Sequence, residues 1–162
     1  MNAISNVELK RPIWQDVAML TLGFWLSASL ILSWVIMPSL YVTGMMTQPS
    51  FASAGYAIFW NFNRIELFCA SLVLASVLAA CSTKSKWRLS SIALSVLLLG
   101  IALVDTYFLT PQMSALGVQL NIFETVLETP ANMNLLHASY WMLEAVKLLA
   151  GCTLLSWCNR NQ

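Results

Sequence analysis

The feature that most constrains this chain is a set of four apolar stretches, each long enough to cross a lipid bilayer. The stretch from Val17 to Met37 contains no charged residue, and a bilayer core about 30 Å thick requires about 20 helical residues. The three later stretches are Leu67–Thr83, Leu89–Val104 and Leu135–Cys158. Because backbone groups in lipid must find hydrogen-bond partners within their own segment, we expect every stretch to be helical.

These stretches predict an all-α fold, a four-transmembrane-helix bundle in which the whole chain, 1–162, is a single membrane domain. We expect the helices at about 15–39, 51–81, 88–109 and 131–158. Charged residues make up 9% of the chain, against about 25% in soluble domains, so lipid must be the solvent for most of the surface. The net charge of +1 argues against a nucleic-acid-binding surface.

The distribution of basic residues predicts the orientation of the bundle. They precede the first expected helix, fill the connection between the second and the third, and follow the fourth: Lys10, Arg11, Lys84, Lys86, Arg88 and Arg160. An even number of spans brings these segments to one side of the membrane, and basic connections favour the cytoplasmic side. We therefore expect cytoplasmic N- and C-termini, in either the cytoplasmic membrane or an internal membrane.

Prolines and an amphipathic pattern predict the structure of the opposite side. Pro38 should end or kink the first helix, and Thr110-Pro111 has the sequence of an N-cap followed by a proline in the first helical turn. The apolar residues that follow recur at helical spacing: Leu116, Leu120, Phe123 and Leu127. We expect a short amphipathic helix at about 111–127 that lies on the outer membrane face, between the third and fourth spans.

Polar side chains inside the expected membrane-spanning helices are the main candidates for a functional site. They are Asn63, Arg64, Glu66, Asp105, His137, Glu144 and Lys147. At about 1.5 Å per residue, Glu66, Asp105 and Glu144 lie roughly 23, 24 and 21 Å from the cytoplasmic ends of their helices. Since an isolated charge within a bilayer costs at least about 2.5–3.5 kcal/mol, we expect these side chains to face one another inside the bundle.

Helical spacing predicts some pairings within this set. Glu144 and Lys147 can pair directly at i, i+3, and Asn63 shares a helix face with Glu66 by the same rule. Arg64, two positions from Glu66, should point elsewhere, either toward Asp105 or toward lipid headgroups.

Two interpretations of this cluster remain open at the level of sequence. In the first, the cluster is a polar site that binds or passes a small cation or a proton, because ionisable residues inside membranes usually have a function. In the second, the same charges fix the register of the helices in a non-catalytic accessory or assembly subunit of a larger membrane complex. Besides the lipid bilayer, the partners would then be other copies of the chain or the rest of such a complex.

A third hypothesis is a redox or soft-metal-binding membrane protein. His137 is the only histidine, and five methionines fall at the outer ends of the expected helices or in the outer loops: Met37, Met45, Met46, Met113 and Met133. The last four, with His137, are the candidate metal ligands. Thioether and imidazole groups suit a soft ion such as Cu(I). Methionine also fills irregular gaps in apolar bundles, so the sequence allows a soft metal ion as cofactor without requiring one.

Signatures of catalysis are missing from the sequence. It contains no GxSxG, no HExxH and no glycine-rich phosphate loop, the motifs that place a nucleophile, a catalytic metal or a phosphate. His137 with Glu144 could in principle exchange protons, but no nucleophile accompanies them. We assign no catalytic residue and favour a function other than enzymatic.

Three segments carry a resemblance to a known family: FWLSASLILSWVIMPSLYVTGMM, FASAGYAIFWNFNRIELFCA and MNLLHASYWMLEAVKLLAG. Over nearly the whole chain they resemble the bacterial domain-of-unknown-function 4149 family, which is similar to eukaryotic transmembrane protein 205-like proteins. The resemblance rests on Pro38, on the aromatic stretch leading to Glu66, and on the helix with His137, Glu144 and Lys147.

The resemblance implies a four-helix integral membrane protein without an established chemistry. The eukaryotic relatives are associated with tolerance to platinum drugs, which agrees with a sulfur-rich outer face but does not identify a substrate. This chain departs from the family near Ser27, where a glycine would be expected on a packing face.

Overall fold

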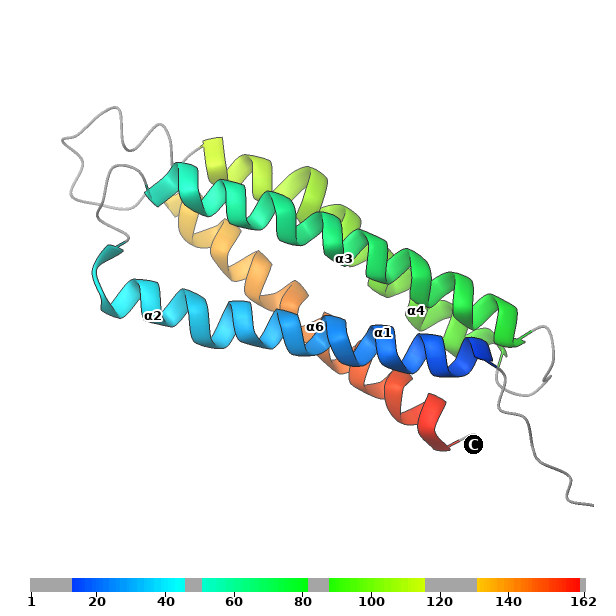
Figure 1. Cartoon of the computed structure of the whole chain (residues 1–162). Coiled ribbons are helices and arrows are strands. Elements are labelled where there is room, and N and C mark those ends of the chain that lie inside the picture. The colour runs from blue at the N-terminus through cyan, green and yellow to red at the C-terminus, as the bar shows by residue number, and fades with distance from the viewer. Residues whose placement is uncertain (1–12, 46–50, 82–87, 116–130, 161–162) are drawn as a thin grey trace, which may run out of the picture.

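The computed structural model describes residues 13–45, 51–81, 88–115 and 131–160. These residues form an all-α fold dominated by four long helices, as predicted (Figure 1). In chain order the elements are α1 (Ile13–Leu30), the π-helix η1 (Ile31–Ile36), α2 (Met37–Val42), α3 (Phe51–Cys81), α4 (Arg88–Val104), the π-helix η3 (Asp105–Leu109) and α6 (Ala131–Arg160).

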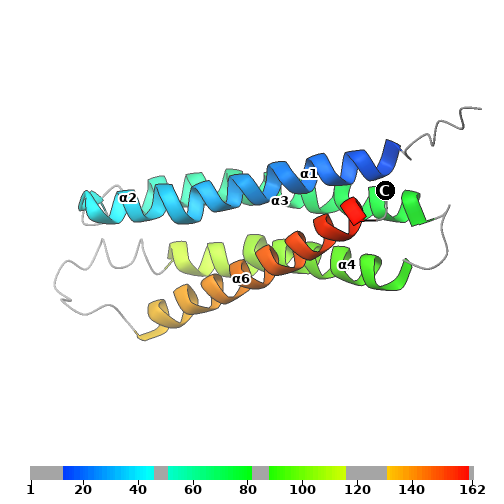
Figure 2. The same cartoon turned by 90° about the horizontal axis from the view of Figure 1, so that it is seen from below.

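The four helices form a ring in which neighbours run in opposite directions. α1 packs against α3 and α6, and α4 packs against the same two helices. The beginning of α1 and the end of α6 lie at one end of the bundle, where α3 also ends and α4 begins (Figure 1). We call this the terminal end, and the opposite end, where α2 ends and α3 begins, the distal end. Figure 2 shows α6 running at an angle to the other helices, in front of α4 in this view.

Each helix is long and apolar enough to cross a membrane. The four candidate spans are Ile13–Leu40, Ser53–Ala80, Leu89–Ala115 and Leu135–Arg160. Large apolar side chains cover the outside of the bundle, among them Leu20, Phe24, Phe68 and Leu149, all more than half exposed. A surface of this kind is compatible with lipid as its solvent and supports the prediction of an integral membrane protein.

Pro38 and Pro111 both lie inside helices. Pro38 does not end the first helix, which continues to Val42, and the alternative expectation, a kink at Pro38, stays a prediction. Thr110 has helical backbone angles, φ −60° and ψ −45°, and is therefore not an N-cap. The helix continues over 110–115, so an independent helix does not begin at residue 111. The remainder of the predicted amphipathic helix, 116–127, lies outside the described residues.

A π-turn before each proline provides the physical reason. Proline lacks an N–H group, and in a regular helix its ring meets the carbonyl of the preceding turn. In η1 the Met37 N–H donates to Leu32 O, and in η3 the Thr110 N–H donates to Asp105 O. This wider hydrogen-bonding pattern takes up one extra residue and lets the chain stay helical through the proline.

The terminal half of the bundle contains a closely packed apolar core. Each helix contributes one fully buried aliphatic side chain to a central layer: Leu22, Val73, Leu98 and Leu154. We call these four side chains the aliphatic layer. Near it, α1 and α6 approach so closely that a Cβ on Gly151 would lie 2.7 Å from Leu26 Cδ2. Small residues at such crossings allow membrane helices to pack by direct contact.

Candidate functional site

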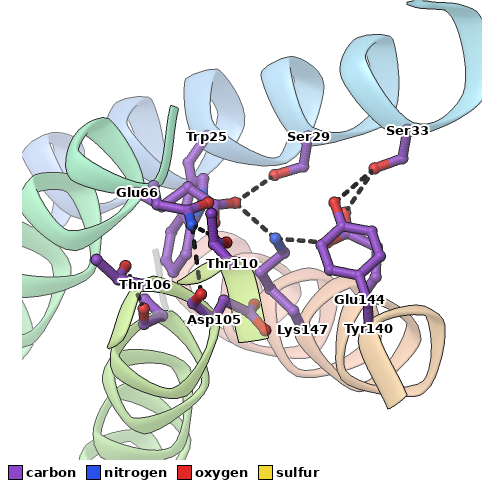
Figure 3. A network of polar contacts seen from close by, with 12 residues as sticks. Trp25, Ser29, Ser33, Glu66, Asp105, Thr106, Thr110, Tyr140, Glu144 and Lys147 are labelled. Atoms are coloured by element: carbon purple, nitrogen blue, oxygen red, sulfur yellow. Dashed lines mark hydrogen bonds and ion pairs between the residues drawn. The ribbon is translucent and has the colours of Figure 1, made fainter. Parts of the chain in front are cut away.

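The candidate site is a group of buried ionisable side chains between the aliphatic layer and the distal end. Glu66 comes from α3, Asp105 from η3, and Glu144 and Lys147 from α6 (Figure 3). All four are buried, with at most 2% of each residue exposed. We call these four residues the carboxylate–lysine centre.

Lys147 joins two of the carboxylates. Its Nζ lies 2.5 Å from Glu66 Oε1 and 2.5 Å from Glu144 Oε2. Glu144 is on the same helix, at the i, i+3 spacing that the sequence predicted. Glu66 is on α3, the helix diagonally opposite α6, and these two helices do not pack against each other among the described residues. The lysine side chain therefore crosses the interior of the bundle and connects two helices that have no backbone proximity.

Helix α1 supplies neutral hydrogen-bond donors to the same carboxylate. Trp25 Nε1 and Ser29 Oγ both donate to Glu66 Oε1, each over 3.0 Å. With Lys147, this oxygen has three donors around it (Figure 3). A carboxylate satisfied in this way can be buried without the cost of an unpaired charge.

A weaker set of contacts leads from Glu144 toward the distal end. Ser33 in η1 donates to Glu144 Oε1 over 3.4 Å, and its Oγ lies 3.5 Å from the hydroxyl of Tyr140. Ser33 is buried, and Tyr140 is half-buried. Tyr140 is one helical turn from Glu144, so this contact brings the hydroxyl group of a half-buried residue close to the centre.

Asp105 differs from the other two acids because none of the described residues donates a hydrogen bond to its side chain. Only 1% of the residue is exposed, and neither Oδ1 nor Oδ2 has a hydrogen-bond partner. Its carboxyl lies within electrostatic range of Lys147, Glu66 and Glu144. Figure 3 shows it beside Lys147. Buried polar atoms are nearly always paired, so an unpartnered carboxyl group calls for an explanation.

Asn63 supports the backbone around Asp105 instead of its side chain. Its Nδ2 donates to Thr110 Oγ1 over 2.7 Å and more weakly to the Asp105 carbonyl over 3.4 Å. Both acceptors belong to the π-turn or its next residue. Asn63 therefore fixes the position of η3 against α3 and leaves the Asp105 carboxyl without a donor.

Two residues that the sequence placed in the cluster lie outside it. Arg64 is exposed, with its guanidinium carbon 4.4 Å from the centroid of the Trp60 ring. The side chain of His137 is also exposed. Helix geometry explains why Arg64 points outward. Side chains two residues apart on a helix differ in direction by about 200°, so Arg64 points outward when Glu66 points inward.

The proposed soft-metal ligands are His137 and four methionines, and two of those methionine side chains lie outside the described residues. Among the described ranges, no group of three or more His, Cys, Asp or Glu residues could hold a metal ion. Met45 is exposed, and Met113 is half-buried. The positions of the Met46 and Met133 side chains lie outside the described residues, so the soft-metal hypothesis stays a prediction.

Sequence reasoning missed the neutral members of the network. Trp25, Ser29 and Ser33 recur every four residues on one face of the first span, and Tyr140 lies one turn from Glu144. The signal was present as a polar stripe on an apolar helix. It was missed because placing serine or tryptophan in lipid costs little free energy. The sequence therefore gives no energetic reason to expect these side chains inside the bundle, as it does for charged ones.

Comparison with known proteins adds no assignment to this site. No protein-family model matches the chain, and no curated protein or solved structure shows significant similarity to it. Membership of the domain-of-unknown-function 4149 family therefore stays a prediction from the sequence.

Proposed function

We propose that this protein is a proton-binding membrane protein in which the carboxylate–lysine centre takes up and releases a proton. The observation that carries the proposal is Asp105, whose carboxyl group is buried and has no donor among the described residues. A proton on that carboxyl would remove its charge and give the group a hydrogen to donate.

Charge balance supports the same conclusion. The centre contains three acids and one base, and Lys147 is already in contact with Glu66 and Glu144. If all three acids were ionised, two negative charges would remain uncompensated in a buried site. Desolvated charge of this size is costly, so bound cations or protons must reduce it.

A proton suits the geometry better than a metal ion. Small hard cations require about six oxygen ligands arranged around one point. In the described part of the chain, the acids do not converge on such a point, and Lys147 Nζ occupies the space between two of them. A proton needs only one carboxyl oxygen and an acceptor.

Infrared difference spectroscopy of the purified protein in lipid tests the proposal. A protonated carboxyl group gives a C=O stretching band that shifts in D₂O, and its intensity should change with pH. The variant Asp105→Asn should lose this band. Asp16→Asn, which removes a half-buried aspartate at the terminal end, is the matched control and should keep it. A wild-type protein without a titrating carboxyl band would refute the proposal.

A structural role of the centre is the second candidate, and the path of Lys147 across the bundle favours it. The network connects α1, α3 and α6, as expected for an accessory or assembly subunit whose helices must keep one arrangement. In that case Asp105→Asn should lower the abundance of the protein or its co-purification with partners. Normal abundance with loss of the carboxyl band supports proton binding instead.

The placement of the protein in its membrane is part of the proposal. We propose that the terminal end faces the cytoplasm, because basic residues flank the helices there, and that the centre lies in the half of the membrane away from it. A single four-helix bundle is small for transport, so proton movement across the membrane would require a homo-oligomer or a larger complex.

A further inference from the structure

We infer that the carboxylate–lysine centre communicates with only one side of the membrane, the side of the distal end, through the hydroxyl groups of Tyr140 and Ser33. This inference rests on the proposed function, because it names the route by which the bound proton enters and leaves. It makes the protein a one-sided proton acceptor and not a channel.

The route consists of consecutive contacts between groups that can pass a proton. Tyr140 OH lies 3.5 Å from Ser33 Oγ, which donates to Glu144 Oε1 over 3.4 Å. A proton that arrives on the Tyr140 oxygen can release the tyrosine's own proton to Ser33, and Ser33 can pass its own proton to Glu144. Both hydroxyl groups end with the number of protons they began with. Glu144, whose charge acts on Asp105 within the same buried centre, is the point at which the proton enters the centre.

Aromatic side chains surround the distal end of this route. Tyr140 stacks edge-to-face on Phe59 of α3 with ring centroids 5.8 Å apart, and it also contacts Trp141 at 6.3 Å. Trp141 in turn meets Trp34 of η1 at 6.1 Å. These four rings connect three elements, η1, α3 and α6. Tyr140 is the member that carries a hydroxyl group hydrogen-bonded to the network, which makes it the gate.

The opposite direction is closed by the aliphatic layer. Each residue of this layer lies two helical turns, about 10 Å, closer to the terminal end than one member of the polar network on the same span. The layer consists of Leu22, Val73, Leu98 and Leu154. The corresponding network members are Ser29, Glu66, Asp105 and Lys147. All four aliphatic residues are 0% exposed. The layer has one side chain from every helix, and among the described residues it contains no polar group that would continue the route.

Polar groups are also buried between the aliphatic layer and the terminal end, and the layer separates them from the carboxylate–lysine centre. Ser76 and Ser91 are fully buried in the terminal half, and neither hydroxyl oxygen has a hydrogen-bond partner among the described residues. They lie beyond Val73 and Leu98 along their helices. They would extend the route to the terminal end only if the aliphatic layer opened.

Cysteine labelling in oriented membrane vesicles tests the inference independently of proton binding. In a background without the native cysteines, single cysteines replace Ser33 and Leu98, and the probe is a small membrane-impermeant cationic thiosulfonate. Met45→Cys and Arg160→Cys, both exposed, report the distal and terminal sides. We expect Ser33→Cys to react from the distal side about a hundredfold faster than from the terminal side. Leu98→Cys should react from neither side.

Several results would overturn the inference. They are equal reaction of Ser33→Cys from both sides, no reaction from either side, or reaction of Leu98→Cys from the terminal side. Adding Tyr140→Ala should accelerate labelling of Ser33→Cys, whereas the exposed Tyr107→Ala should not, and equal effects would exclude Tyr140 as the gate.

A second measurement separates this inference from the proposed function. Tyr140→Phe keeps the ring and removes the hydroxyl, so hydrogen–deuterium exchange of the carboxyl band should slow by about tenfold or more, while Tyr107→Phe should exchange at the wild-type rate. An unchanged rate in Tyr140→Phe refutes the relay but leaves proton binding intact. One-sided labelling in a protein without any titrating carboxyl refutes proton binding but leaves the one-sided access intact.

Discussion

The two halves of the bundle are built from the same four helices but differ in what their inward-facing side chains are. In the terminal half these positions hold mainly apolar residues such as Leu22 and Leu154, both fully buried, with a few buried serines among them. In the distal half they hold Ser33, Tyr140 and Phe59, and the last two are only half-buried. The carboxylate–lysine centre lies at the boundary between the two halves.

The two halves of the bundle are therefore held together by different kinds of contact. Aliphatic side chains interlock and close the terminal half, and lipid-exposed helices gain stability from this direct packing. The distal half replaces that packing with hydrogen bonds and aromatic contacts, which hold the helices at specific points. A polar site at the boundary has packed aliphatic side chains on one side and hydrogen-bonded hydroxyl groups and aromatic rings on the other.

The largest effect on the free energy of unfolding should come from removing the positive charge of the carboxylate–lysine centre, at the boundary between the two halves. Lys147→Met leaves Glu66 and Glu144 buried without their shared cation, and removal of one partner from a buried ion pair costs about 3–5 kcal/mol. We expect a loss of this size in the free energy of unfolding, measured by circular dichroism in mixed micelles.

The compensated variant provides the control for this change. Lys147→Met combined with Glu66→Gln and Glu144→Gln removes the stranded charges and should recover most of the stability. If Lys147→Met alone unfolded like the wild type, the ion pairs would contribute nothing to the fold.

The next largest effect should come from the aliphatic layer. Leu98→Ala opens a cavity in the terminal half and should cost about 2–3 kcal/mol, at the lower end of the range for buried leucines because lipid removes part of the hydrophobic contribution. Leu149→Ala, at a position 71% exposed on the outside of α6, is the matched control. Equal losses in thermal unfolding for both variants would show that the terminal half is not the packed core.

A smaller effect is expected where α1 and α6 touch. Gly151→Ala places a Cβ 2.7 Å from the buried Leu26 side chain, which must shift, and we expect a cost of about 1–2 kcal/mol. Gly100→Ala is the control, because a Cβ there meets nothing within 4 Å and alanine favours the helix. The two melting temperatures should move in opposite directions, and a stabilised Gly151→Ala protein would contradict the close contact.

The smallest effect should come from the outward face at the same level. Arg64→Gln removes a guanidinium that stacks on Trp60 outside the bundle and should leave both the melting temperature and the carboxyl band unchanged. Glu66→Gln, two residues away, should alter both because Glu66 binds Lys147. A large loss in Arg64→Gln would show that Arg64 takes part in the buried network after all.

Part of the site could be predicted from the sequence. The cost of burying charge in lipid predicted that Glu66, Glu144 and Lys147 would meet, and equal heights along the helices identified Asp105 as their neighbour. Height alone does not specify the rotation of a helix about its axis, so the same reasoning listed the exposed Arg64 and His137 with the buried residues, although the spacing from Glu66 had allowed Arg64 to point toward the headgroups. It also missed Trp25 and Ser29, which complete the shell around Glu66.

The sequence by itself determined the four spans and their alternating directions, because the length of an apolar run and the need to pair backbone groups in lipid are properties of each segment alone. Only the tertiary structure decided which face of each helix points inward. That choice left Asp105 without a donor, brought Ser33 between Tyr140 and Glu144, and placed an aliphatic layer on one side of the centre. Packing between helices sets these rotations, and it depends on contacts between residues far apart in the chain.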